Sequence, residues 1–380
     1  SAYAVSRGEV RLRHEEAPSP PASFEREGGR WVCVNPLIVP LHRGLHEKME
    51  RISRECGENP FCSASVKGPL GVIASGAAWA KLARVLKESP LLEELSLLKL
   101  GMLNPLPEAL ICDFLQKVDK ALIVEDGGAF LERELRIISQ RRAIATPIRG
   151  KLSGDLPLEG ELTGESIASS LREFLGSKPE ASPAPSEQAR EAPSLRGFCE
   201  GCPYVPFFET LAEVMEELGP GRPIISSDTG CALFARRPPF ELLDSKICLG
   251  SAVGVAAGMA KAAAERPILA LIGDSAFLHT GLAALIDAAF HRSPMLVVIL
   301  DNSTTAMTGC QPHPGTDIGV EKWGYRAVSL EGLVRALPVD FIRRVDPFKQ
   351  EEVKECLKEG LSLRSLGVVI VKSPCILLEP

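Results

Sequence analysis

The chain of 380 residues is predicted to be an α/β protein with two open parallel-sheet domains joined by a linker rich in proline and alanine. Three observations predict this organisation. Short apolar runs alternate with stretches of helical spacing in both halves, which is typical of parallel strands and their crossover helices. Many of these runs are apolar throughout, as expected of strands covered on both faces. Residues 177–196 hold Pro, Ala, Ser and Glu without an apolar period, which predicts a semi-extended linker.

Composition and charge narrow the classes of protein to consider. The length predicts two or three domains. The formal net charge of −6 gives no reason to expect nucleic-acid binding. No apolar run is long enough to span a bilayer and no leader opens the sequence, so we expect no membrane contact and a cytoplasmic location. In such a chain, eleven cysteines indicate a metal, a cluster or buried thiols rather than disulfides.

The first half of the chain is predicted to form a small parallel sheet within residues 31–176. Residues 1–30 show no sustained period and are expected to be the tail of a preceding domain. Charged residues with apolar ones at three-to-four spacing predict an amphipathic helix over 41–55. Pro107 is a start signal for the helix that follows it. The remaining predicted elements are strands at 70–75, 95–100 and 121–124 and helices at 77–88, 108–118 and 129–140.

The second half, residues 197–380, carries the other predicted sheet. Its predicted elements are helix 207–218, strand 224–227, helix 250–264, strand 268–272, helix 282–290, strand 295–300 and strand 367–371. The helix over 250–264 is built of small residues, so its backbone can approach the sheet or a cofactor closely. Packing alone explains this composition, and the helix does not define a site without its neighbours.

Polar residues follow two neighbouring buried strands of the second half. Asp274 comes after Gly273 at the end of the first strand, and Asn302 comes after the second. The helical crossover makes these strands parallel, so both residues are expected at the ligand-binding edge of the sheet. Carboxylate and amide oxygens suit Mg²⁺, and the helix start after Ser275 favours an anion. The alternative is an ordinary strand–helix–strand unit with chance polar residues at its strand ends.

Cysteines form a second candidate site. Cys199 and Cys202 make a CxxC pair directly after the linker, which alone is compatible with zinc, iron–sulfur, redox chemistry or none. A redox pair is disfavoured because no strand precedes it. Cys231 and Cys375 each follow a predicted parallel strand, which places them at the same sheet edge as Asp274. Four thiolates fit an iron–sulfur cluster or zinc.

Seven other cysteines remain. Cys310 lies in the loop after Asn302 and is the alternative to one of the four ligands. The others fall largely in predicted helices or apolar strands, where a buried thiol is the default. They are Cys33, Cys56, Cys62, Cys112, Cys248 and Cys356.

The pattern Gly-Asp-Ser, a gap, and then Asp-Asn resembles the motif of thiamine diphosphate enzymes. By that resemblance, the Mg²⁺ ligands are Asp274, Asn302 and the main chain of Thr304. The family more often has Gly-Asp-Gly and Asn-Asn. Ser275 and Asp301 depart from that wording, but neither replaces a liganding side chain.

Two longer sequence segments resemble one branch of these enzymes, the large subunit of the indolepyruvate ferredoxin oxidoreductases. They are TTAMTG at 304–309 and QPHPG at 311–315. The resemblance implies oxidative decarboxylation of a 2-oxoacid, with indolepyruvate and other arylpyruvates suggested, and transfer of the acyl group to coenzyme A. It also implies that a 4Fe–4S cluster on the CxxC pair, Cys231 and Cys375 passes electrons to ferredoxin.

The same resemblance supplies further site residues. The residues expected beside the cofactor, in addition to the Mg²⁺ ligands, are Gly250, Ser251, Gly273, Ser275, Thr308 and Gly309. His279 and His313 are nominated for the substrate side. A satisfied loop histidine is the alternative for His279.

The first half resembles the second domain of the 2-oxoacid oxidoreductases, which is similar to the transketolase C-terminal domain. The matching words are GVIASG at 71–76, LNPLPE at 103–108 and IVEDG at 123–127. The resemblance implies a mainly structural domain that helps to seat partner subunits or coenzyme A. Glu125, at a strand end, is interpreted as a solvated terminus rather than a catalytic acid.

The family also carries parts that we do not find in this sequence. A pyrimidine-binding domain, with the glutamate that activates the cofactor, is expected ahead of residue 1, and a ferredoxin-like domain beyond residue 380. We therefore expect a split subunit or a fragment that is inactive without a partner chain carrying the pyrimidine-binding domain and without the small oxidoreductase subunit. The alternatives are a non-redox thiamine diphosphate decarboxylase subunit and a non-catalytic assembly subunit.

Overall fold

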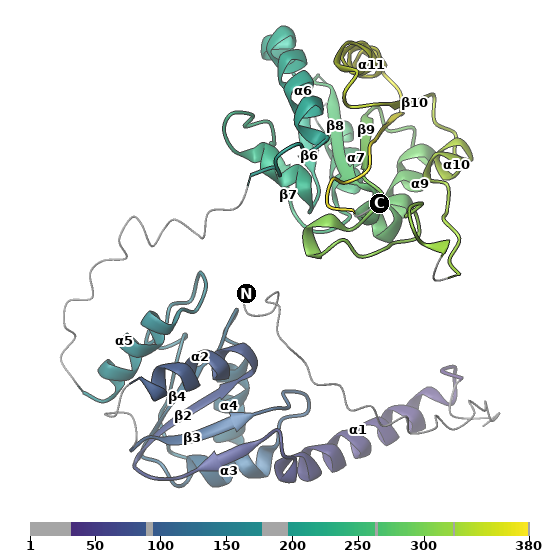
Figure 1. Ribbon diagram of the computed structural model, residues 1–380. Helices are drawn as coiled ribbons and strands as arrows, with labels where there is room; N and C mark the ends of the chain where they lie inside the picture. The colour runs from purple at the N-terminus through teal and green to yellow at the C-terminus, as the bar shows by residue number, and fades with distance from the viewer. Residues whose placement is uncertain (1–31, 89–93, 177–196, 263–264, 322–323, 379–380) are drawn as a thin grey trace. The chain divides into compact units, whose positions relative to one another are not determined.

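A computed structural model gives the fold of the chain (Figure 1). It describes residues 32–88, 94–176, 197–262, 265–321 and 324–378. The chain separates into two compact units, Ser1–Arg190 and Glu191–Pro380, and we treat each by itself. The predicted tail at 1–30 and the predicted linker at 177–196 lie outside the described residues. Within the described ranges, no helix combines the length and the apolar character needed to cross a membrane.

The first unit contains a five-stranded sheet in the order β1-β3-β2-β4-β5. Its strands are β1 (Ser63–Ser65), β2 (Leu70–Ser75), β3 (Ser96–Leu100), β4 (Lys120–Val124) and β5 (Ile148–Arg149). The central three are parallel and confirm the predicted strands. The prediction of a purely parallel sheet is wrong at one edge, because β1 pairs antiparallel with β3. β1 is short and exposed, and β5 has two residues, so neither forms an apolar run.

Helices cover both faces of this sheet. They are α2 (Gly76–Lys87), α3 (Glu108–Leu115), α4 (Phe130–Arg141) and α5 (Gly164–Phe174). Successive side chains of a strand point to opposite faces, so Val72 packs with α2 and α5 whereas Ile73 packs with α3 and α4. Of these helices, α5 was not predicted. It begins at Thr163, whose hydroxyl accepts a hydrogen bond from the Ser166 backbone in a capping box.

The helix predicted over 41–55 is α1 (Ile38–Glu55), which is followed by a 3₁₀ turn, Cys56–Glu58. No residue of α1 is buried. Its C-terminal half lies beside α3, and the Ser53 hydroxyl donates a 2.6 Å hydrogen bond to the carbonyl of Leu106. Ile38, Val39 and Leu45 in the N-terminal half are exposed.

The second unit contains a six-stranded, fully parallel sheet in the order β10-β11-β9-β8-β6-β7. Its strands are β6 (Ile224–Ser227), β7 (Ser245–Lys246), β8 (Ile268–Gly273), β9 (Leu296–Asp301), β10 (Phe341–Val345) and β11 (Gly367–Lys372). The four central strands are the predicted ones. The fold class, α/β with two open sheets, is therefore confirmed.

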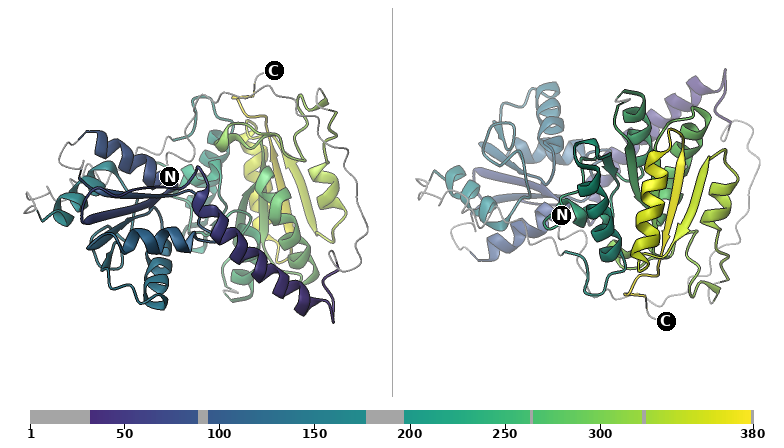
Figure 2. Two further views of the ribbon diagram at one scale, coloured as in Figure 1. Left: turned by 90° about the horizontal axis from the view of Figure 1, so that it is seen from below. Right: turned by 90° about the horizontal axis from the view of Figure 1, so that it is seen from above.

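Two layers of helices enclose this sheet (Figure 2). One face carries α6 (Tyr204–Leu218) and α11 (Gln350–Ser362). The other carries α7 (Ala252–Ala262), α9 (Leu282–Phe290) and α10 (Leu330–Arg335). Between β8 and α9, the short helix α8 (Asp274–Ala276) passes into a π-helical turn, Phe277–Gly281. Such turns often lie at functional sites.

Candidate cofactor site

A cavity of about 220 Å³ lies at the carboxyl edge of the six-stranded sheet. The loops after β6, β8 and β9 form its walls, together with the first residue of α6. β6 lies between β7 and β8, so the strand that follows β6 in the chain pairs on one side of it and the next strand pairs on the other. Open α/β sheets bind ligands where the strand order reverses in this way. The predicted cofactor residues that line the cavity are Gly273, Asp274, Ser275, Asn302, Thr304 and Thr308.

The structure brings Asp274 and Asn302 together at this edge, because β8 and β9 are paired in register. One oxygen of the buried Asp274 carboxylate accepts a 2.8 Å hydrogen bond from the Ser275 backbone. The other accepts a 3.1 Å hydrogen bond from the backbone of Asn302. The Asn302 side-chain oxygen accepts a 3.1 Å hydrogen bond from the backbone of Thr304. These oxygens are fixed before any ligand arrives.

An ionic network, buried on one side and open to water at Asp317, holds the loop after β9 in shape. Ser303 is a non-glycine residue with a φ of 64°, in the left-handed region, which costs conformational energy. Its hydroxyl donates to Asp317 at 2.7 Å and accepts from Lys372 at 2.7 Å. The Lys372 ammonium also contacts Asp301 at 3.0 Å and Asp317 at 3.0 Å. Burial raises the pKa of Asp301, and Lys372 opposes that rise.

His313 contacts the site, and His279 does not. The His313 Nε2 lies 3.1 Å from Oδ2 of Asp274, but without the alignment of a hydrogen bond, so this buried nitrogen has no hydrogen-bond partner in the described chain. The Nδ1 atom accepts a 3.1 Å hydrogen bond from the Gly315 backbone, which places the proton of a neutral ring on Nε2. His279 is exposed on the π-helical turn and does not line the cavity.

Three of the predicted cofactor residues do not line the cavity: Gly250, Ser251 and Gly309. Gly250 has a φ of 79°, and a Cβ atom there would overlap the Thr280 side chain. Its backbone donates a 2.8 Å hydrogen bond to the buried carboxylate of Asp228, which also accepts from the backbone of Ala252 at 3.0 Å. Asp228 thus ties the start of α7 to the cavity wall, a role that the sequence reasoning missed.

Hydroxyl groups dominate the polar lining, and no lysine, arginine or histidine is present among the described lining residues. Tyr204, also missed from the sequence, is the first residue of α6 and lines the cavity. Burial raises the pKa of Tyr204 well above its usual value, and Asp274 and Cys231 add to the rise. A negatively charged ligand in this cavity must therefore bring a cation with it or rely on neutral donors.

The predicted cysteines gather at the same edge. Burial and, after it, the neighbouring Cys202 and Cys375 thiols raise the pKa of Cys231 to about 12. Cys199 lies close enough to act on Cys202 and Cys375 as well. The backbone of Cys375 donates a 3.0 Å hydrogen bond to the carbonyl of Asn302, which fixes its distance from the cavity loop. Cys310 also lies close enough to Cys375 to add to the rise in the pKa of that thiol.

The spacing of these thiols bears on what they can hold. Within the described ranges, no three His, Cys, Asp or Glu side chains are placed to hold one metal ion as they stand. A single zinc ion draws its ligands to one point, whereas a four-iron cluster takes one thiolate at each iron and spreads them apart. The described thiols thus gather at one sheet edge without meeting at a single point.

The remaining cysteines only partly follow the prediction. Cys56, Cys62 and Cys356 are buried. The expectation of a buried thiol is wrong for Cys33 and Cys248, which are exposed because each lies in a connection outside helices and strands.

Glu125 also departs from its prediction. The prediction of a solvated strand terminus is wrong, because the side chain is buried after β4. Its carboxylate accepts hydrogen bonds from the backbones of Leu131 at 2.7 Å and Glu132 at 3.0 Å. The first N–H groups of a helix have no acceptor within the helix. Glu125 supplies that acceptor and so caps the N-terminus of α4.

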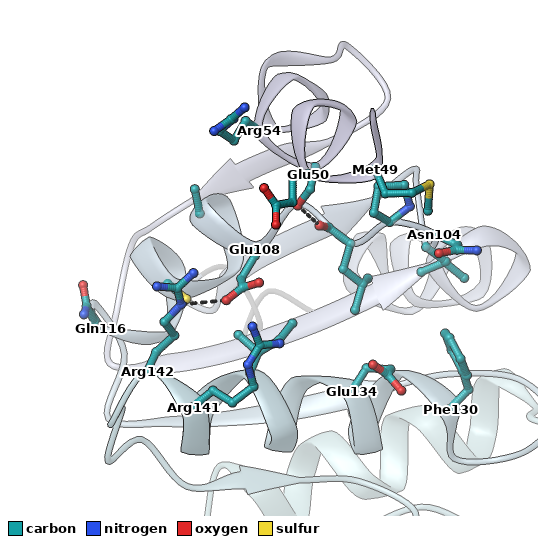
Figure 3. A pocket seen from close by; sticks show the side chains of 17 residues that line it. Met49, Glu50, Arg54, Asn104, Glu108, Gln116, Phe130, Glu134, Arg141 and Arg142 are labelled. Carbon is teal, nitrogen blue, oxygen red and sulfur yellow. Dashed lines mark hydrogen bonds and ion pairs between the residues drawn. The ribbon is translucent and has the colours of Figure 1, made fainter. Parts of the chain in front are cut away.

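A larger cavity, about 1080 Å³, lies in the first unit between α1, α3 and α4 (Figure 3). Its walls mix acidic and basic side chains, and Glu108 accepts a 2.6 Å ionic hydrogen bond from Arg142. Of the buried polar atoms that lack a partner in the described chain, none belongs to this cavity. No buried polar atom in the described lining of this cavity thus needs a partner from a ligand. The cavity at the edge of the six-stranded sheet is therefore the candidate site.

Comparison with known proteins agrees with this geometry. Residues 228–372 match the family described as thiamine pyrophosphate enzyme, C-terminal TPP binding domain. This span runs from the loop after β6 to the end of β11 and includes the cavity loops. The second unit thus carries a thiamine diphosphate-binding domain.

Relatives extend the match to almost the whole chain. The indolepyruvate oxidoreductase subunit IorA of Methanothermobacter marburgensis is 32% identical over 382 residues, covering 98% of this chain and 60% of the relative. The subunit of the same name from Archaeoglobus fulgidus is 32% identical over 392 residues, covering 98% of this chain and 61% of the relative. The chain is a homologue of IorA and spans about three fifths of the length of these relatives.

One solved structure is similar at a lower level. It is a 2-oxoglutarate:ferredoxin oxidoreductase from Magnetococcus marinus, with 19% identity and a TM-score of 0.42. The alignment covers 48% of this chain and 65% of that one. We draw no argument from a likeness at this level.

Proposed function

We propose that this chain is a subunit of a thiamine diphosphate-dependent 2-oxoacid:ferredoxin oxidoreductase of the indolepyruvate type. The observation that carries the proposal is one sheet edge that holds both the Asp274–Asn302 pair and the gathered cysteines. The IorA relatives support the indolepyruvate branch. The reaction would be oxidative decarboxylation of an arylpyruvate, with the acyl group passed to coenzyme A and the electrons to ferredoxin.

The cavity is suited to a magnesium-bound diphosphate. Asp274, Asn302 and the main chain of Thr304 would hold Mg²⁺ by oxygen atoms, the ligands that this ion prefers. A cation is needed because the described lining offers no basic side chain to offset the charge of a diphosphate. When bound, thiamine diphosphate supplies the electron sink that makes decarboxylation of a 2-oxoacid feasible.

His313 would act as a positioning residue in this site. Its Nε2 atom lies 3.1 Å from Oδ2 of Asp274, and its ring is fixed by the Gly315 hydrogen bond to Nδ1. A histidine held in one tautomer next to a metal-binding carboxylate sets the orientation of that carboxylate. His279 is exposed, so a role on the substrate side would require contact with groups beyond this unit.

Four thiolates would hold the 4Fe–4S cluster. Cys199 and Cys202 precede α6, Cys231 follows β6 and Cys375 follows β11, so only the folded second unit unites them. When bound, the cluster supplies one-electron transfer, which zinc cannot provide. Cys310, which lies close to Cys375, is the alternative fourth ligand.

Activity would require partner chains. A pyrimidine-binding domain with its activating glutamate, the small oxidoreductase subunit and ferredoxin complete the proposed enzyme. The chain spans about three fifths of the length of its IorA relatives. The first unit would serve to seat those partners or coenzyme A.

The test is an anaerobic preparation of the full chain. We expect Mg²⁺-dependent binding of thiamine diphosphate, iron and sulfide near four each per chain, and no CO₂ release from indolepyruvate until the partner chain is added. Release of CO₂ by the lone chain would refute the need for a partner. Cofactor binding without iron would favour a non-redox decarboxylase, and cofactor binding without turnover in the assembled complex would favour an assembly subunit.

A further inference from the structure

Tyr204 carries a buried hydroxyl group without a hydrogen-bond partner in the described chain. Its side chain lines the cavity of the proposed diphosphate site, and the residue is only 3% exposed. Burial of an unpaired hydroxyl lowers the stability of a folded protein, so native structures rarely tolerate it without a reason.

The ring of Tyr204 is held in place. It belongs to the same packed core as Phe207 and Phe208, on the first turns of α6. Since the ring is enclosed by this core, the hydroxyl cannot turn outward to water. It stays at the cavity wall and faces the space shared with Asp274 and Cys231.

Three threonine hydroxyl groups of the cavity already donate hydrogen bonds within the chain. Thr305 donates to the Ser275 hydroxyl at 2.9 Å, and Thr304 donates to a backbone carbonyl at 3.3 Å. Thr308 donates to the side chain of Gln311 at 2.6 Å. Of the described residues that line the cavity, Tyr204 alone has a buried polar side-chain atom without a partner.

We propose that the Tyr204 hydroxyl donates a hydrogen bond to a phosphate oxygen of the diphosphate bound in this cavity. The inference rests on the proposed function, since it assumes that the cavity holds a diphosphate. Phosphate oxygens are strong acceptors, and a bond to a charged acceptor is stronger than one between neutral groups. With no basic side chain among the described lining residues, a neutral phenol is a donor that the cavity can offer.

The test compares Tyr204→Phe with wild type and with Tyr325→Phe, which removes the same hydroxyl from a residue that is 62% exposed. Calorimetry on the full chain with Mg²⁺ measures the affinity for thiamine diphosphate and for inorganic diphosphate. We expect Tyr204→Phe to weaken both by about tenfold or more. We expect Tyr325→Phe to leave both unchanged. The melting temperature of ligand-free Tyr204→Phe should equal or exceed that of wild type, because an unpaired hydroxyl is lost.

Each other outcome overturns the inference. If wild type binds thiamine diphosphate and Tyr204→Phe binds it equally well, the proposed function stands and the hydrogen bond does not. If inorganic diphosphate is unaffected, or if only the reduction potential of the cluster moves, the hydroxyl serves a different acceptor. A clear drop in the ligand-free melting temperature would reveal a structural partner. If wild type binds no thiamine diphosphate, the proposed function fails and this inference fails with it.

Discussion

Replacement of Lys372 by methionine should destabilise the second unit and disturb the loop that carries Asn302. The lysine side chain is 14% exposed and pairs with Asp301, whose side chain is 9% exposed. Removal of one partner of a buried pair typically costs about 3–5 kcal/mol. We expect about 3 kcal/mol, the lower end, because Asp317 is half-exposed and water can reach the site from that side. For a unit of this size, the melting temperature should fall by about 6–12 °C.

The pKa of Asp301 predicts how the stability of this variant changes with pH. Burial raises the pKa of Asp301 in the folded chain, and Lys372 lowers it, so loss of Lys372 should raise that pKa further. The charged carboxylate is then penalised above its folded pKa and relieved below it. The stability deficit of the variant should therefore be complete at neutral pH and shrink as the pH falls through the folded pKa of Asp301.

The assay is urea unfolding of the full chain at several pH values, with Lys349→Met as the control. Lys349 pairs with Glu352 on the surface, and its loss should cost less than about 1 kcal/mol. Asp301→Asn added to Lys372→Met should restore part of the stability, because the unpaired charge is then removed as well. The reasoning is refuted if Lys372→Met costs no more than the control, or if its deficit grows on acidification.

Three further predictions concern the site. Asp274→Ala should weaken binding of thiamine diphosphate by at least about 100-fold and remove its Mg²⁺ dependence, as measured by calorimetry with and without the metal. Cys375→Ser should lower the iron content of anaerobic protein and leave cofactor binding intact; if Cys310→Ser does this instead, the fourth ligand is Cys310. Gly250→Ala should cost about 2 kcal/mol or more in urea unfolding, because its φ is left-handed and its Cβ overlaps a side chain. Gly319→Ala, also left-handed but with open space around it, should cost less.

The central strands of both sheets were predictable from the sequence, and the edge strands were not. β8 and β9 are continuous apolar runs, and burial on both faces leaves no other pattern available to them. The sequence of β10 is Phe-Ile-Arg-Arg-Val, and its two arginines lie on a strand at the sheet edge. It therefore lacks the continuous apolar run by which the central strands were predicted. α10 and α11 were missed too, since the charge density of α11 hides its apolar positions among polar ones.

The candidate site shows the same limit at the level of single residues. The approach of Asp274 to Asn302 follows from parallel pairing, so the order of strands and loops sufficed to place them together. The ligand assignments at this edge stay predictions. The role of Tyr204 could not be predicted, because no sequence pattern shows whether a hydroxyl group has a hydrogen-bond partner in the folded chain. Glu125 was misjudged because the donors that surround it come from a helix that folds back onto the strand end.

The position of α1 has a consequence for motion. Its 18 residues make a rod about 27 Å long that contacts the body of the first unit through its C-terminal half. A helix without buried side chains draws little stability from tertiary packing, and short helices in water are marginal by themselves. Amide hydrogens near Leu45 should therefore exchange with solvent much faster than those near Ile52. The helix would fray from its N-terminal end. A partner that covered Leu45 would slow hydrogen exchange along the helix.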